Sequence, residues 1–130
     1  MKILNLTQHP ATQDQIDAGV VDLQGEQLEM LKSLLTFEHL PSYQEIEDRA
    51  HDIALLVMFN GLGNDDDDPS FFKAMIGGAP YLMSALENAL KSHSVMPVYA
   101  FSERMSVEEI QPDGSVRKLN KFKHKGFVEV

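Results

Sequence analysis

Three short polar segments of the chain carry the side chains that could do chemistry. Thr7-Gln8-His9 offers a hydroxyl, an amide and an imidazole in succession, and an imidazole can move a proton near neutral pH. Gly77-Gly78 comes just before a predicted helix, where free backbone N–H groups attract an anion. Ser102-Glu103-Arg104 ends in a guanidinium, which can hold a phosphate through two parallel hydrogen bonds. These residue types favour a site for an anionic ligand.

Each segment also has a plainer structural interpretation. His9 could be an exposed or structural histidine, and the glycine pair could be a tight turn between a strand and a helix. Arg104 could pair on the surface with Glu103 or Glu108. The glycine pair is neither a G-x-G-x-x-G motif nor a P-loop, because no Lys-Ser/Thr follows it. A nucleotide triphosphatase is therefore not indicated.

Apolar runs and helical spacing predict the elements that position these segments. Strands are expected at Lys2–Leu6, Val20–Leu23, Phe71–Ile76 and Met96–Phe101. Helices are expected at 13–18, at 25–37, after Ser42 as far as Gly61, and from Pro80 to Leu90. Thr12 with Gln15, and Ser42 with Glu45, have the spacing of a capping box at a helix start.

The alternation of strands and helices predicts one α/β domain over residues 1–130. The expected architecture is three-layer and Rossmann-like, with a mostly parallel sheet, helices on both faces and right-handed crossovers. In such sheets ligands bind beyond the carboxyl ends of the strands. The three polar segments each follow a predicted strand, so we expect them to converge there.

A closing hairpin adds a fourth candidate. The predicted strands Val107–Ile110 and Val116–Phe122 flank Gln111-Pro112-Asp113-Gly114, a strong turn signal. If Ile110 faces Val116, antiparallel pairing places His124 opposite Ser102. A bulge at Gly114 would shift that pairing by about one residue. The hairpin is therefore expected to carry the His124 imidazole back towards Ser102.

The composition limits the compartment and the partners. The chain has no cysteine, which excludes disulfides and cysteine ligands and favours a reducing, cytoplasmic location. No apolar run approaches the length of a signal peptide or a membrane helix, so no membrane partner is expected. The four aspartates of Asp65–Asp68 are expected in a solvated loop, and they lack EF-hand spacing, so no metal site is predicted.

The net charge of −9 is unevenly distributed along the chain. Residues 1–70 hold 3 Lys/Arg against 14 Asp/Glu, whereas residues 71–130 hold 8 against 6. The negative net charge of the whole chain disfavours binding of duplex nucleic acid but leaves room for one local anion site. Five basic residues without an acid lie within 115–126, and they could form a solvated edge strand or face a phosphate.

Several segments together resemble a known family. They are Leu4-Asn5-Leu6-Thr7-Gln8-His9, Ile76-Gly77-Gly78-Ala79-Pro80-Tyr81-Leu82-Met83, Pro97-Val98-Tyr99-Ala100-Phe101-Ser102-Glu103-Arg104, Val107-Glu108-Glu109, Pro112-Asp113-Gly114-Ser115-Val116, and Phe122-Lys123-His124 with Phe127. The combination resembles small stand-alone CRISPR-associated proteins with a CARF-like fold, which are regarded as ring nucleases, or a relative of them outside CRISPR systems. The similarity covers residues 1–23 and 71–130.

The resemblance implies a homodimer that binds cyclic oligoadenylate, or a related nucleotide, across its two-fold axis in antiviral defence. It implies cleavage without a metal or other cofactor, in which a ribose 2′-hydroxyl attacks the adjacent phosphorus. By this resemblance, Thr7, Gln8 and His9 would line the first loop, Gly77 and Gly78 would donate to phosphate, Ser102, Glu103 and Arg104 would flank the ring, and His124 would approach from the hairpin.

Two functions are consistent with these residues. One is a metal-independent phosphodiesterase, with His9 and His124 moving protons and Ser102 beside them. The other is a module of the same fold that senses a nucleotide without cleaving it. The two differ in whether a proton-transfer group stands at the ligand.

Overall fold

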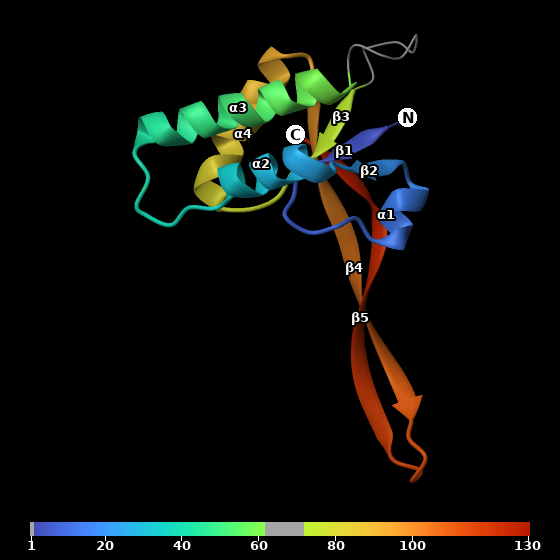
Figure 1. Cartoon of the computed structure of the whole chain (residues 1–130). Helices are drawn as coiled ribbons and strands as arrows, with labels where there is room; N and C mark the ends of the chain where they lie inside the picture. The colour runs from blue at the N-terminus through green and yellow to red at the C-terminus, as the bar shows by residue number, and fades with distance from the viewer. Residues whose placement is uncertain (1, 62–71) are drawn as a thin grey trace.

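Five strands form a single sheet in the order β2-β1-β3-β4-β5 (Figure 1). The computed structural model describes residues 2–61 and 72–130. The strands are β1 (Ile3–Asn5), β2 (Val20–Asp22), β3 (Lys73–Met75), β4 (Met96–Ile110) and β5 (Val116–Glu129). The first four are parallel, and β5 is antiparallel to β4. The predicted α/β fold, with a mostly parallel sheet and a closing hairpin, is confirmed.

The helices are α1 (Gln13–Asp17), α2 (Gly25–Leu35), α3 (Tyr43–Gly61) and α4 (Pro80–Ser92). Helices α2, α3 and α4 pack in the main core against one face of the sheet, which presents Leu4 and Ala74. The other face presents Ile3 and Met75, against which Ala11 packs just before α1. In the strand order, the step from β1 to β2 goes towards one edge of the sheet, whereas the step from β3 to β4 goes towards the other edge. Right-handed crossovers therefore place α1 and α4 on opposite faces.

The predicted helix starts are confirmed by their caps. The Thr12 hydroxyl accepts a hydrogen bond from Gln15 N at 3.3 Å, and the Gln15 side chain accepts one from Thr12 N at 3.0 Å. At the start of α3, the Ser42 hydroxyl accepts from Glu45 N at 3.1 Å. The expected loop at Asp65–Asp68 and the start of the third expected strand lie outside the described residues. Among the helices described, none combines the length and apolar character needed to span a bilayer.

The register of the hairpin agrees with the prediction. Ile110 pairs with Val116, and Ser102 pairs with His124. The one irregularity between the two strands falls between Phe101 and Ser102 rather than at the turn. Within the turn, Gly114 has φ +86°, which glycine adopts without steric cost.

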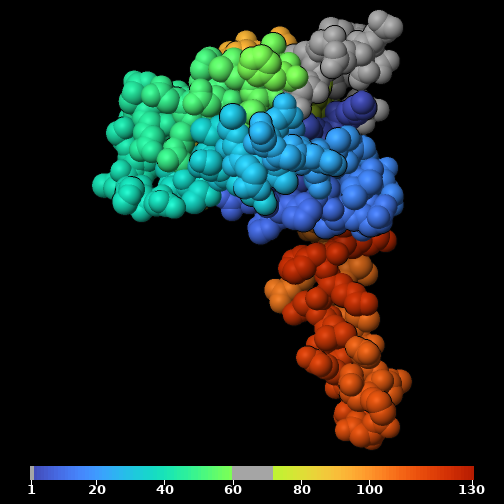
Figure 2. All heavy atoms as spheres, in the orientation of Figure 1, coloured from blue at the N-terminus to red at the C-terminus, as the bar shows by residue number. Residues whose placement is uncertain are grey.

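The segment Ser102–Ser106 corrects the predicted boundaries. We expected β4 to end at Phe101 and a separate strand to begin at Val107, but β4 is one strand of 15 residues. The polar segment stays extended because the opposite strand pairs with its backbone throughout. Residues 102–124, here called the arm, therefore project from the body as a narrow two-stranded ribbon (Figures 1 and 2).

Candidate functional site

A cleft of about 770 Å³ opens at the carboxyl ends of β1 and β3, beside Tyr99 and Ala100 in the first part of β4. Its walls include Thr7, Gln8 and His9 from the loop after β1. Gly77 and Gly78 from the loop after β3 face into the same space. The structure thus brings two of the three predicted segments together, at the edge of the sheet where parallel strands of this topology bind ligands.

The buried side chain of Asn5 holds the loop after β1 in place. Asn5 is 3% exposed, and its Nδ2 donates to the His9 carbonyl and to Asp22 Oδ1, both at 2.8 Å. Its Oδ1 accepts from Thr7 N at 2.9 Å and from Thr7 Oγ1 at 2.7 Å. Asp22 in turn accepts from Ala11 N at 3.2 Å. Both the nitrogen and the oxygen of the Asn5 amide thus make two hydrogen bonds each. These bonds fix the backbone of residues 7–9, while the His9 side chain remains exposed.

The glycine pair lies against this loop. A Cβ at Gly77 would be 3.4 Å from Thr7 Cγ2, so the loops after β1 and β3 are in close contact. Gly78 has φ +147°, which an L side chain rarely adopts. The sheet ends just before them, where Ile76 N donates to Val98 O at 2.9 Å. Within the described residues, no partner is found for the backbone N–H of Gly77 or Gly78, so both can donate to a ligand.

Tyr99 forms part of the wall on the β4 side. Its hydroxyl donates to Glu87 Oε2 of α4 at 2.9 Å. Burial and this contact with Glu87 raise the pKa of Tyr99 to about 12. Tyr99 therefore keeps its proton near neutral pH and is a neutral wall of the cleft rather than a proton acceptor.

The cleft of one chain contains little charge. Among the described residues that line it, none is a lysine or an arginine. His9 is the one imidazole among the described residues that line it. An anion bound there would depend on backbone N–H groups and on the dipole at the start of α4.

The third predicted segment does not line the cleft. Ala100 is the outermost lining residue of β4, and Ser102 follows two residues further along the same strand. Glu103 forms an ion pair with Lys125 across the hairpin at 3.1 Å. Arg104 is exposed on the arm. The placement we expected for this segment, at a loop after the strand, is wrong, because the paired strand continues through it.

His124 is also outside the cleft lining. It lies opposite Ser102, as predicted, and its ring packs edge-on against Phe127 with centroids 4.8 Å apart. Its Nδ1 is shielded from solvent and has no hydrogen-bond partner in the described part of the chain.

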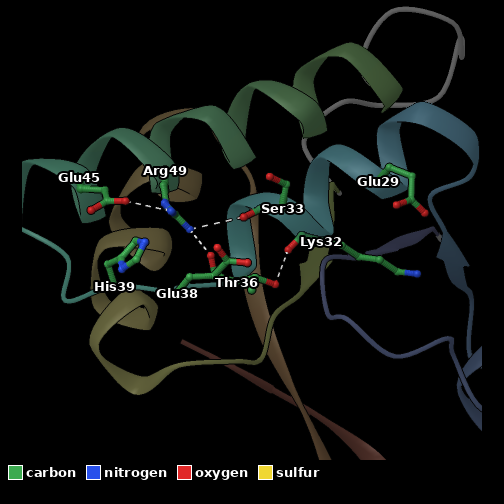
Figure 3. A pocket seen from close by; sticks show the side chains of 8 residues that line it. All are labelled: Glu29, Lys32, Ser33, Thr36, Glu38, His39, Glu45 and Arg49. Carbon is green, nitrogen blue, oxygen red and sulfur yellow. Dashed lines mark hydrogen bonds and ion pairs between the residues drawn. The ribbon is translucent and has the colours of Figure 1, made fainter.

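A second hollow, of about 450 Å³, lies between α2 and α3 (Figure 3). Its central guanidinium, Arg49, donates to the carbonyls of Leu34 at 3.3 Å and Thr36 at 2.5 Å, and pairs with Glu45 at 2.9 Å. The same group lies 4.2 Å from the ring centroid of Phe37. Arg49 thus satisfies carbonyls at the end of α2 and is not free for an anion.

Comparison with known proteins gives one match. A family model, described as the uncharacterized protein MJ1673 family, matches residues 1–128. The chain belongs to this family. Searches of the curated proteins and of the solved structures returned no significant match.

Two residues of this MJ1673 family member were missed by reasoning from sequence. Asn5 interrupts a buried aliphatic run, and a polar residue at such a position needs hydrogen-bond partners, which was the available signal. Tyr99 was counted only as part of an apolar strand. Its contact with Glu87 depends on how α4 lies against β4, which the sequence does not express.

Among the described residues, no group of three His, Asp or Glu side chains is placed to hold a metal ion.

Proposed function

We propose that the protein binds a cyclic oligoadenylate in the cleft after β1 and β3 and cleaves it as a metal-independent phosphodiesterase. The observation that carries this proposal is the placement of His9 in the same cleft as the unpaired backbone N–H groups of Gly77 and Gly78. A proton acceptor and hydrogen-bond donors to the phosphate are two of the elements that this reaction uses. The resemblance to ring nucleases supplies the substrate class.

The reaction is a transesterification. A ribose 2′-hydroxyl forms a bond to the adjacent phosphorus and loses its proton to a base. The bond from phosphorus to the 5′-oxygen breaks, and that oxygen takes up a proton from the solvent, to which the base later releases the proton it accepted. The products are a 2′,3′-cyclic phosphate and a 5′-hydroxyl, with no water or oxidant consumed.

In this proposal the loops divide the work. His9 accepts the proton of the attacking hydroxyl, on a loop that Asn5 holds in position. Gly77 and Gly78 donate to the phosphate oxygens on which negative charge develops. The absence of cysteine is consistent with action in the cytoplasm, where the messenger would be made.

A nucleotide-sensing module of the same fold is the second candidate. The observation that favours it is that the described lining of one cleft holds a single imidazole as a proton-transfer group. Two such groups are the usual requirement when one oxygen must lose a proton and another must gain one. Under this alternative the messenger binds and is released unchanged.

A cleavage assay distinguishes the two. The protein is incubated with cyclic tetra- and hexa-adenylate in the presence of a chelator, and the products are separated by chromatography. We expect linear products ending in a cyclic phosphate, at a rate that His9→Ala lowers about 100-fold or more. His39→Ala, an exposed histidine outside the cleft, is the matched control and should keep the wild-type rate. Binding without products favours the sensor, and neither binding nor products rejects both.

A further inference from the structure

We propose that the arm of one chain lies across the cleft of a second copy and supplies the cationic groups that this cleft lacks. The inference rests on the proposed function for the nature of the ligand, but the pairing of two chains can be tested without it. Three features of the arm support it: its exposed apolar side chains, its charge and its position.

The arm leaves apolar side chains without a covering layer. Ile110 is 78% exposed, Phe122 73% and Val116 58%, on a ribbon of two strands. A two-stranded hairpin is marginally stable alone in water, and usually gains its stability by packing on another layer. Among the residues that the structure describes, β4 pairs beyond Phe101 with β5 alone, and β5 is an edge of the sheet. An additional protein surface would cover both the side chains and the free backbone edge.

The charges favour a second copy as that surface. Residues 2–95 hold five Lys/Arg against fifteen Asp/Glu, a balance of −10. The strand β5 has the opposite sign, with five Lys/Arg against Glu129. On the body, Gln15 of α1 lines the cleft, and the exposed Asp14 and Asp17 flank it in the same helix. The basic strand of one chain is therefore opposite in charge to the body of another, whose acidic residues include Asp14 and Asp17 in the helix that carries Gln15.

Duplex nucleic acid is a poorer partner for the arm. Residues 96–130 carry six basic and five acidic side chains, so the ribbon as a whole is nearly neutral. Glu103 neutralises Lys125 at 3.1 Å, and Glu109 stands opposite Arg117. A binding surface for duplex phosphates would need a continuous excess of positive charge.

The position of the arm prevents it from folding back onto its own cleft. Ser106 lies six residues beyond Ala100 on one continuous strand, about 20 Å along it. Figures 1 and 2 show the ribbon directed away from the body. In a two-fold dimer the arms exchange symmetrically, so each cleft gains the exposed Arg104 of its partner. A ligand would then be held between His9 of one chain and the arm of the other.

Disulfide trapping tests the pairing directly, because the chain has no cysteine of its own. Gln8→Cys at the rim of the cleft is combined in turn with Ser102→Cys, Ser106→Cys or Ser115→Cys along the arm. A disulfide needs Cα atoms within about 7 Å, so a bond from position 106 or 115 to position 8 must join two chains. We expect a covalent dimer with at least one of these two arm positions. Absence of any dimer with all three overturns the proposal.

Light scattering during size-exclusion chromatography gives the oligomeric state of the native chain. We expect a dimer, and Phe122→Asp should raise the dissociation constant of that dimer at least tenfold. Tyr43→Asp changes an equally exposed aromatic residue on α3, and should leave the dimer intact. A monomeric wild-type protein, or equal effects of the two substitutions, contradicts the proposal.

Where the protein shows cleavage activity, mixing two inactive variants adds a third test. His9→Ala damages the cleft, and Arg104→Ala damages the arm. If each site combines two chains, an equal mixture forms mixed dimers with one intact site and recovers about one quarter of the wild-type rate. Sites built within one chain recover nothing. A protein without activity but with the trapped dimer would reject the phosphodiesterase proposal and retain the pairing of arm and cleft.

Discussion

Replacing Asn5 by alanine should lower the free energy of unfolding by about 4 kcal/mol. The Asn5 amide makes four hydrogen bonds of 2.7–2.9 Å, two as donor and two as acceptor, at a site that is 3% exposed. Each such bond contributes about 1 kcal/mol net. The loss would be a large part of the roughly 5–15 kcal/mol that stabilises a domain of this size. Urea denaturation at neutral pH, with the slope of the transition compared as well as its midpoint, gives the difference.

Asn5→Asp separates the two halves of this network. It keeps an oxygen for the two bonds from Thr7, but it loses both donor bonds and places a second carboxylate beside Asp22. We expect a loss of stability at neutral pH, part of which returns on acidification, because a protonated carboxyl can donate to Asp22 as the amide does. Asn88→Ala, at an exposed position of α4, is the matched control and should change stability by less than about 0.5 kcal/mol.

A change of less than about 1 kcal/mol in the free energy of unfolding on Asn5→Ala would refute this reasoning. It would mean that the loop after β1 does not depend on the amide, and that the fixed position of the loop has another cause. Loss of stability at Asn88 as large as at Asn5 would show a general sensitivity to the substitution instead.

Three further substitutions test other parts of the structure. Gly78→Ala should lower the free energy of unfolding by about 1–3 kcal/mol, measured by thermal or urea denaturation, because a φ of +147° is strained for alanine. Space for the methyl group is available, so an unchanged stability would contradict the strain. Tyr99→Phe should cost about 1 kcal/mol at pH 7. Because folding raises the pKa of Tyr99 from 10.0 to about 12, the difference in stability between wild type and Tyr99→Phe should persist up to pH 10 and shrink above it. A stability difference that stays constant with pH would be evidence against the contact with Glu87. Arg49→Met should cost about 2 kcal/mol through the lost carbonyl contacts at the end of α2, and a neutral result in urea denaturation would contradict that role.

Much of the body could be predicted from sequence because its elements bury apolar side chains in regular patterns. The short parallel strands are apolar runs, and the caps at Thr12 and Ser42 are local hydrogen bonds written in the spacing of two residues. The pairing of Ser102 with His124 follows from the turn, since the register of a hairpin is set at its closed end.

The arm could not be predicted in the same way. Strand prediction depends on a buried face, and the stretch from Ser102 to Ser106 is exposed throughout. The segment therefore looked like a loop at the end of a strand, and its side chains were expected beside the cleft. The network around Asn5 was missed for another reason, because its partners His9, in the loop after β1, and Asp22, in β2, are brought together only by the folded sheet.

Nuclear magnetic resonance of the backbone amides tests the central claim most directly. The protein is labelled with 15N at glycine and titrated with cyclic tetra-adenylate and cyclic hexa-adenylate under chelating conditions. We expect the amide signals of Gly77 and Gly78 to shift saturably with one of these ligands, while Gly19, on the loop before β2, stays unchanged. Shifts confined to other glycines, or none at millimolar ligand, would contradict a phosphate site at the cleft.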